Sequence, residues 1–403
     1  MSVVDPGSRK AAARAALAIA PGVLLANFAG GIAFPILPIV GVRAHLPLAF
    51  IGVILAANRA TRVVASPIVG SFVDRVGGRP MLLVGLLLQV VVMIFYVLGV
   101  RTGHPGIFFL LGRLLHGPGS ACVFVAGQAL ALHAGGRAHG GRAAGSVRAA
   151  LALGVPLGLV GGGIFSDLWG ESVAFEISIG ALVIATILAF ALVPDLRVQR
   201  GPRPRFVDTL AALSDRRLSA VGALNFACSF SASGMVLTTI VLLVSQRGVS
   251  VLGFGEKGTA GALMGLMVLT EALFMPFAGR AGDRWRAHAA IALGGLMALV
   301  PALAVLALAH RAGVLCGALV LLGLAAGALG PSLLAMVGQW VDVERRGVGV
   351  GLLQLCGDAG GTLGPMVGTA LLAGSVTTAY LVSAAFVACF LPAGIWLAMK
   401  GRA

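Results

Sequence analysis

Long apolar stretches alternate with short polar breaks along the whole chain. Each stretch holds about 20 residues or more, enough for a helix to cross the hydrocarbon core of a bilayer and to satisfy its own backbone hydrogen bonds there. The ten-residue alternation of a membrane barrel does not occur. The pattern predicts an all-α membrane protein with twelve spanning helices, at residues 14–40, 50–70, 81–100, 105–132, 145–165, 172–193, 218–245, 258–279, 288–309, 313–337, 347–373 and 376–399.

Composition supports this pattern. Of the 403 residues, 59% are hydrophobic and only 11% are charged, and the mean hydropathy is +1.01. A soluble domain cannot cover its surface with so few polar groups. We therefore expect a multi-pass monomer in a cell membrane, the inner or plasma membrane of a prokaryote, with membrane lipid as its first partner.

The net charge of +15 would suit a nucleic-acid partner, but its distribution indicates a membrane topology instead. Twenty of the 29 Lys and Arg residues fall in segments on the same side as both termini, and five fall on the other side. The positive-inside rule then predicts that both termini are cytoplasmic, and no nucleic acid is needed to explain the charge. Four arginines remain within or at the edges of spans: Arg59, Arg62, Arg113 and Arg148.

A long polar connection at residues 194–217 divides the spans six and six. It predicts a bundle over residues 1–193, a cytoplasmic linker over 194–217 and a second bundle over 218–403. The two halves also match in sequence. "PIVGSFVDR" at 67–75 recurs as "PFAGRAGDR" at 276–284, and "LLGRLLHGPGSACVFVAGQ" at 110–128 recurs as "LLGLAAGALGPSLLAMVGQ" at 321–339, at offsets of 209 and 211.

Two further matches keep the same order. The glycine spacing of the fifth span recurs in the eleventh at an offset of 206, and Asn27-Phe28-Ala29 recurs as Asn225-Phe226-Ala227 at 198. Nearly constant offsets indicate an internal duplication. Transporters use such repeats, with the substrate path between the two halves.

A basic motif follows the second span, and its counterpart follows the eighth. In "GSFVDRVGGR" we expect a short cytoplasmic loop, in which the first glycine lets the helix end close to a neighbour and the aspartate caps or pairs. A later glycine supports the turn, and the arginines anchor at the inner surface. The motif residues are Gly70, Asp74, Arg75, Gly77 and Arg79, with Gly279, Asp283 and Arg284 in the second half.

These motifs resemble those of the major facilitator superfamily. The loop is similar to the signature G-x-x-x-D-R-x-G-R-[RK], with Gly78 where an arginine is commonest, and "RLLHGPGSA" at 113–121 is similar to the fourth-helix motif R-x-x-x-G-x-G. "FPILP" at 34–38 resembles the end of the family's first helix. The resemblance implies two pseudo-symmetric six-helix bundles and secondary transport by alternating access.

The fifth span resembles the motif of the drug:proton antiporter branch, G-x8-G-x3-G-P-x2-G-G. Leu159 replaces its proline, and in the eleventh span Thr369 replaces the last glycine. Glycines at these spacings allow close helix approach, so simple helix packing remains an alternative to an antiport role. The matching residues are Gly145, Gly154, Gly158, Gly162 and Gly163, and in the eleventh span Gly360, Gly364 and Pro365.

Charges at membrane depth are costly and indicate function. The offset of 209 places Glu271 opposite Arg62 in the repeat, and Asp358 is the other mid-span carboxylate. Family packing of the second helix on the eleventh and the fifth on the eighth predicts that Arg59 or Arg62 reaches Asp358, and that Arg148 reaches Glu271. Such pairs could couple or gate transport by binding and releasing protons, could contact an anionic substrate, or could be static.

Two more polar positions belong to this hypothesis. Arg113 is linked in the family to proton coupling, and His116 follows it by one turn. The first span has Asn27 but no carboxylate, unlike several drug exporters, so coupling would use Glu271, Asp358 or Glu176.

Substrate contacts are predicted on the first and seventh helices. Asn27, Phe34, Asn225, Phe226 and Phe230 could line an apolar cavity, or could equally be packing residues. The five cysteines lack metal-ligand spacing and are expected to be buried in spans; no metal or organic cofactor is expected. We also find no enzyme motif in an aqueous segment.

The sequence thus predicts an exporter of small hydrophobic drugs or metabolites, an antiporter of the multidrug-resistance type driven by the proton gradient. A proton symporter that imports a small organic solute is the alternative, and a membrane receptor without transport is a third possibility from another class.

Overall fold

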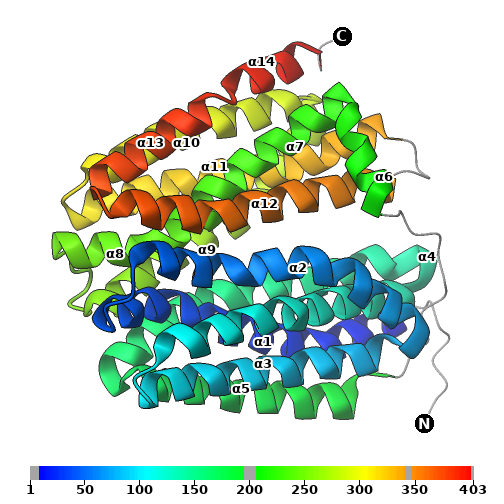
Figure 1. Cartoon of the computed structure of the whole chain (residues 1–403). Helices are drawn as coiled ribbons and strands as arrows, with labels where there is room; N and C mark the ends of the chain where they lie inside the picture. Colours follow the sequence, from blue (N-terminus) through cyan, green and yellow to red (C-terminus); the bar gives the residue numbers. More distant parts are fainter. Residues whose placement is uncertain (1–8, 195–205, 342–345, 401–403) are drawn as a thin grey trace. The chain divides into compact units, whose positions relative to one another are not determined.

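The computed structural model describes residues 9–194, 206–341 and 346–400, and every regular element in these ranges is a helix (Figure 1). Contacts divide the chain into two compact units. The first unit contains Met1–His45 and Ala60–Gly201, and the second contains Leu46–Arg59 and Pro202–Ala403, so the boundary falls within the predicted linker. The second helix is therefore shared, because its first half packs with the second unit. Residues 195–205 of the predicted linker lie outside the described ranges.

The first unit is built from long helices that pack side by side. α1, α3, α4 and α5 contact one another, and most of the contact lies between α1 and α4 and between α3 and α4. Their bounds are α1 Arg9–Arg43, α2 Leu48–Val76, α3 Gly78–Arg101, α4 Pro105–Trp169 and α5 Glu171–Leu192.

α4 contains two predicted spans in one helical run of 65 residues. Its two arms pack on the same helix, α1, in opposite directions. The first arm is antiparallel to α1, since His116 lies at Gly30 and Gly127 lies at Ile19. The second arm is parallel to α1, since Gly154 lies at Leu24 and Gly162 lies at Ile32. The run therefore doubles back between its arms, Pro105–His133 and Ala144–Trp169. The loop expected between the fourth and fifth spans is helical.

The second unit repeats this plan with more breaks in its helices. The seventh span consists of α7, a π-helix (η2) and α8, and the twelfth consists of α13 and α14. The bounds are α6 Phe206–Ala211, η1 Ala212–Ser214, α7 Arg216–Cys228, η2 Ser229–Val236, α8 Leu237–Arg247, α9 Glu256–Trp285, α10 His288–Leu308, α11 Ala312–Trp340, α12 Arg346–Leu372, α13 Val376–Ala388 and α14 Leu391–Lys400.

Within the described residues, eleven segments are long and apolar enough to cross a membrane. The predicted span that is not among these eleven is the eleventh, α12, whose 27 residues are long enough but include Gln354, Asp358 and many glycines, which lower its hydropathy. This set of long apolar helices indicates a multi-pass membrane protein. The predicted cytoplasmic side of the termini stays a prediction.

The glycines of the fifth and eleventh spans lie where helices cross closely. A methyl group on Gly158 would lie 2.8 Å from the carbonyl carbon of Phe28 and 3.0 Å from the Cα of Gly31 on α1. On Gly364 it would lie 2.7 Å from the Cα of Gly234 in η2, and it would also clash with the carbonyl of Phe230. Both spans therefore pack backbone against backbone, as small residues allow in membranes.

These contacts correct one of the repeat matches. Gly158 meets Phe28 as Gly364 meets Phe230, so the counterpart of Phe28 is Phe230, one helical turn beyond the predicted Phe226. The contacts on α1 are three residues apart, Phe28 and Gly31, but those in the seventh span are four apart, Phe230 and Gly234. The wider turn of η2 accommodates the extra residue.

The basic motif is also placed differently from the prediction. α2 continues to Val76 and α3 begins at Gly78, so Gly70, Asp74 and Arg75 are helical and not in a loop. The connection is Gly77 alone, with a φ of 108° that suits glycine. In the second unit, Gly279, Asp283 and Arg284 likewise lie within α9.

Candidate functional site

Charged groups gather inside the second unit, around α12. The Arg59 side chain, from the first half of α2, lies on α12 at Gly361, where a methyl group would be 2.7 Å from its Cζ. Asp358 is one turn earlier on α12, is 3% exposed, and accepts a hydrogen bond of 3.0 Å from Gln354 Nε2. Arg59 also interacts electrostatically with Glu271 on α9. The Arg59 guanidinium thus lies one turn from Asp358 along α12 and also interacts with Glu271.

Glu271 is held in place by a close crossing of α9 and α11. Methyl groups on Gly323 and Gly327 would lie 3.2 Å from the Glu271 amide nitrogen and 2.8 Å from its carbonyl oxygen. The small residues four positions apart let the two backbones touch. This fixes the depth of the half-buried Glu271 carboxylate in the unit.

The first unit carries the opposite charge at the equivalent place. Arg62, the repeat counterpart of Glu271, interacts electrostatically with His116, whose counterpart is Gly327. The same two positions therefore interact in both units, electrostatically between a cation and a histidine in the first and by backbone contact between a carboxylate residue and a glycine in the second. This agreement of paired positions supports the duplication.

Arg113 is the most enclosed ionic group of the first unit. It is 0% exposed, and its guanidinium lies 4.9 Å from the centre of the Phe34 ring. None of its three guanidinium nitrogens has a hydrogen-bond partner among the described residues. A desolvated cation–π contact contributes about 2 kcal/mol, but burying an ion costs on the order of several kcal/mol. The ring alone does not offset that cost.

Polar neighbours of Arg113 were missed by the sequence reasoning. Tyr96 interacts electrostatically with Arg113 and is fully buried, and Gln89 lies two turns away on the same face of α3. The hydroxyl of Tyr96, Oε1 of Gln89 and Nδ1 of His116 have no hydrogen-bond partner in the described part of the chain. A signal was available, since Gln89 and Tyr96 are the polar side chains of an otherwise apolar third span.

Arg148 lies exposed on the second arm of α4. Its predicted pairing with Glu271, and that of Arg62 with Asp358, would join the two units, and both stay predictions.

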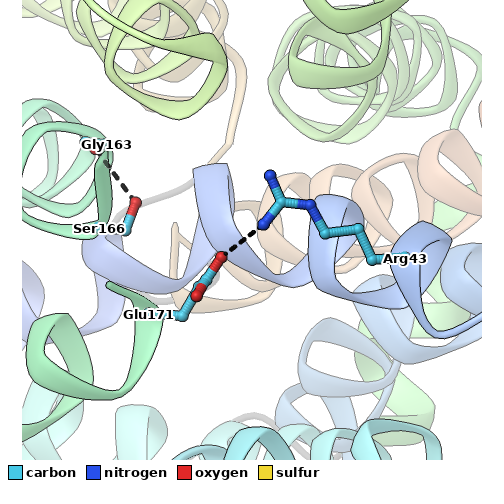
Figure 2. Close-up of polar contacts among 4 residues, drawn as sticks. All are labelled: Arg43, Gly163, Ser166 and Glu171. Carbon is cyan, nitrogen blue, oxygen red and sulfur yellow. Dashed lines mark hydrogen bonds and ion pairs between the residues drawn. The ribbon is translucent and has the colours of Figure 1, made fainter. Parts of the chain in front are cut away.

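The acidic residues at the start of α5 are engaged in exposed ion pairs. Arg43 Nη1 lies 2.9 Å from Glu171 Oε1 (Figure 2), and Arg101 Nη2 lies 2.5 Å from Glu176 Oε1. Figure 2 also shows the nearby Ser166 hydroxyl donating to the carbonyl of Gly163. The two ion pairs join α1 and α3 to α5, and they place Glu176 in an exposed pair near a helix end, which suits a structural role.

The motif arginines differ in their contacts. Arg79 donates a hydrogen bond of 2.5 Å to the carbonyl of Phe190 and lies 5.2 Å from its ring centre, which ties α3 to α5. Arg75 and Arg284 are exposed. The carboxylate of Asp283 accepts a hydrogen bond of 3.1 Å from Nε2 of the buried His288.

The predicted cavity residues make packing contacts. Asn27 donates to the carbonyl of Val23, and Asn225 donates to that of Leu353. Phe226 and Phe230 stack with centres 6.2 Å apart, in a cluster with Phe386 and Phe390 of the last span. Phe34 covers Arg113 instead. Their role as substrate contacts stays a prediction.

The cysteines do not all match the expectation of burial. Cys122 and Cys228 are buried, but Cys389 is exposed near the end of α13. Among the described residues, no group of three His, Cys, Asp or Glu side chains is arranged to hold a metal ion.

Comparison with known proteins agrees with the helical plan. The model of the Major Facilitator Superfamily matches residues 19–256 and 253–402. Multidrug resistance protein 2 of Bacillus subtilis is 29% identical over 182 residues, a match that covers 44% of each chain. The chain thus matches less than half the length of this curated relative.

Solved structures of low identity share the fold. The nucleoside transporter NupG gives a TM-score of 0.79 at 13% identity over 95% of this chain and 98% of its own. A bacterial homologue of the human lysosomal transporter Spinster gives 0.77 at 14%, over 98% of both chains, and the human organic anion transporter TETRAN gives 0.67 at 20%, over 95% and 99%. With the family model matched along nearly the whole described chain, the protein belongs to the Major Facilitator Superfamily, as a transporter of that fold.

Proposed function

We propose that the protein exports small hydrophobic molecules, as drugs or metabolites, in exchange for protons. It works as a monomer in a cell membrane by alternating access, with the proton gradient as its energy source and no cofactor. The observation that carries this proposal is the charge cluster of the second unit. Arg59 lies on α12 one turn from the buried Asp358 and interacts with Glu271.

The cluster can bind and release a proton when its geometry changes. A carboxylate in a low-dielectric site is stable as an anion while a guanidinium is next to it, and it binds a proton when the guanidinium moves away. Arg59 cannot lose its own proton, so it acts as the fixed charge. The proton therefore goes to Asp358 or Glu271 in one conformation and leaves when the contact forms again.

Export is favoured over import by two observations. The glycine spacing of the fifth and eleventh spans is similar to that of antiporters, although its glycines also serve helix packing. The curated relative is named as a multidrug resistance protein. Neither observation identifies the molecule that is carried.

The test begins with a growth screen of an overproducing strain against neutral, cationic and anionic compounds. A compound to which the strain becomes resistant is then added to inverted vesicles that hold a proton gradient. An antiporter releases protons in response to the compound. Proton movement in the same direction as the compound would instead indicate a symporter.

Two isosteric variants test the cluster. Glu271→Gln and Asp358→Asn should lose proton release and uphill export while remaining expressed and folded, because an amide cannot exchange the proton. Glu171→Gln, which alters a carboxylate of the first unit paired with Arg43, is the control and should retain both. Wild-type proton dependence in both cluster variants would exclude this mechanism.

A further inference from the structure

The buried Arg113 of the first unit has no negatively charged partner among the described residues. A guanidinium stays protonated and has five N–H donors, and a carboxylate or a similar anion is the partner that satisfies it best. In the described structure it contacts the face of the Phe34 ring, while its Nε, Nη1 and Nη2 atoms make no hydrogen bond.

The carboxylates that the structure describes in the first unit do not supply this partner. Arg113 lies well inside the first arm of α4, whereas the described acids of the unit lie in the last turns of α2 and α4 or the first turns of α5. Two of these acids bind Arg43 and Arg101. The described acids are Asp74, Asp167, Glu171 and Glu176.

Other unsatisfied polar atoms lie near the guanidinium. The Tyr96 ring rests on α4 beside Arg113, since a methyl group on Gly112 would lie 3.0 Å from its Cδ1, and its hydroxyl is unpartnered. The Nδ1 atom of His116, one turn along α4, is unpartnered as well. Tyr96, Arg113 and His116 are all more than nine-tenths buried. These groups form a polar site on α3 and α4 with more donors than the described unit satisfies.

The surroundings of the polar site are aromatic. Tyr96 packs edge to face against Phe109, with ring centres 5.6 Å apart, and against Phe175 at 5.3 Å. Phe34 covers the guanidinium and is itself half-buried, so part of this residue is accessible while Arg113 is not. A ligand that displaces this ring would place an anionic group on Arg113 and an apolar body against aromatic side chains.

The second unit has no such cation at the same place. The repeat counterpart of Arg113 is Leu324, which lines an apolar groove of about 430 Å³ on α9, α10 and α11. An apolar side chain is therefore sufficient for helix packing at this position. Packing does not explain why the first unit has an arginine, Arg113, there.

We propose that Arg113 binds the anionic group of the transported molecule, so that the substrate class is small organic acids with an apolar body. This inference deepens the proposed export function and rests on it. Arg113 donates two parallel hydrogen bonds to the carboxylate, and the Tyr96 hydroxyl donates to a carboxylate oxygen. Phe34 moves aside as the acid enters and covers Arg113 again after it leaves.

The test uses matched acids and amides, which differ in charge but hardly in shape. Binding of benzoate and benzamide, and of 1-naphthoate and 1-naphthamide, is measured calorimetrically on the full chain in lipid nanodiscs at pH 7.4. The acid should bind at least about tenfold more tightly than its amide, because charge-assisted hydrogen bonds are roughly twice as strong as neutral ones. Equal affinities within each pair would overturn the proposal.

Variants assign any preference to the site. Arg113→Gln should reduce the acid-to-amide ratio to about one, and Arg113→Lys should keep part of it, because lysine keeps the charge but not the planar fork. Tyr96→Phe should weaken the acids a few-fold and leave the amides unchanged. Arg311→Gln, an exposed arginine before α11, is the control and should match wild type. An acid preference that survives in folded Arg113→Gln would refute the assignment, and if that variant does not fold, an unchanged ratio in Arg113→Lys would do so.

Two further measurements distinguish the sources of failure. Replacing gluconate by chloride at constant ionic strength should not change acid binding; if chloride alone displaces the acids completely, the site holds an inorganic anion and the proposal fails. Flux is then measured in proteoliposomes. Proton-linked flux of a neutral or cationic probe without acid preference would leave the export function standing and refute this inference. Arg113-dependent acid binding without flux of any probe would show that Arg113 is an anion site and would refute the export function.

Discussion

The tightest contact of the first unit makes Gly158→Ala a sharp test of the helix crossing. An alanine methyl would lie 2.8 Å from the carbonyl carbon of Phe28 and 3.0 Å from the Cα of Gly31. Carbon atoms prefer separations of about 3.5–4.0 Å, so the second arm of α4 would have to move about 1 Å away from α1. Both obstacles are backbone atoms and cannot rotate aside. Such overpacking costs about 1–3 kcal/mol.

The same substitution at Gly145 is the matched control. Gly145 belongs to the same glycine pattern and the same helix, but a methyl group there would meet nothing within 4 Å. Replacing glycine by alanine stabilises a helix by about 1 kcal/mol, and this gain is common to both variants. Their difference, about 1–3 kcal/mol, therefore isolates the crossing.

Equilibrium unfolding in mixed micelles of dodecylmaltoside and SDS, followed by helical circular dichroism, gives the free energy of unfolding of each variant. We expect Gly158→Ala to unfold at a lower SDS fraction than Gly145→Ala. Equal stabilities would show that the two helices do not approach as closely as the contacts indicate. A Gly158→Ala variant that is stable but does not transport would assign the glycine to function instead of packing.

Three further predictions concern the turn, the topology and the division of roles. Gly77→Ala should lower the free energy of unfolding by about 1–2 kcal/mol, because alanine is strained at a φ of 108°, whereas Gly180→Ala, with open space around it, should not; the same unfolding titration checks this. In a chain without native cysteines, an impermeant maleimide added to whole cells should label Arg101→Cys but not Arg284→Cys, and the reverse would contradict cytoplasmic termini. Glu271→Gln should keep the acid-to-amide binding ratio while losing proton coupling; calorimetry checks the ratio, and its loss would show that the two sites are not separate.

The positions of the spans were predictable because hydropathy marks the hydrocarbon core directly. The second span was expected at 50–70, and α2 covers it but continues to Val76. Hydropathy does not mark the end of a helix, since the backbone hydrogen bonds continue into the polar flank where charges are solvated. The pattern therefore predicts a loop at Asp74 and Arg75, which the structure shows to be helical.

The π-helix of the seventh span could not be read from the sequence. One extra residue leaves an apolar segment apolar, so the pattern does not change. Its effect is visible only in contacts, where Phe230 replaces Phe226 as the counterpart of Phe28. The match of Asn27-Phe28-Ala29 to Asn225-Phe226-Ala227 holds in the sequence, but the structurally equivalent residues lie one helical turn further along.

Charged residues of the site were found from sequence because ions stand out in apolar segments. Arg59, Asp358 and Glu271 were selected in this way, but the identity of their neighbours was not. That Arg59 rests on Gly361 depends on the rotation of α2 and α12 about their axes, which hydropathy leaves open. Tyr96 was overlooked because a tyrosine in a span is common, and its hydroxyl becomes significant only beside a buried cation.

The duplication explains how one scaffold can hold two different kinds of chemistry. Equivalent positions are paired in both units, Arg62 with His116 electrostatically and Glu271 with Gly327 through the backbone, so the backbone framework does not require either charge. The first unit carries cations at Arg62 and Arg113, and its described carboxylates are near helix ends. The second unit has carboxylates at membrane depth beside Arg59 instead. An anion-binding arginine in one repeat and proton-binding carboxylates in the other would let an acid and a proton occupy separate sites. Because the two ligands then do not displace each other directly, their exchange has to be linked through the conformation of the protein, which is what alternating access supplies.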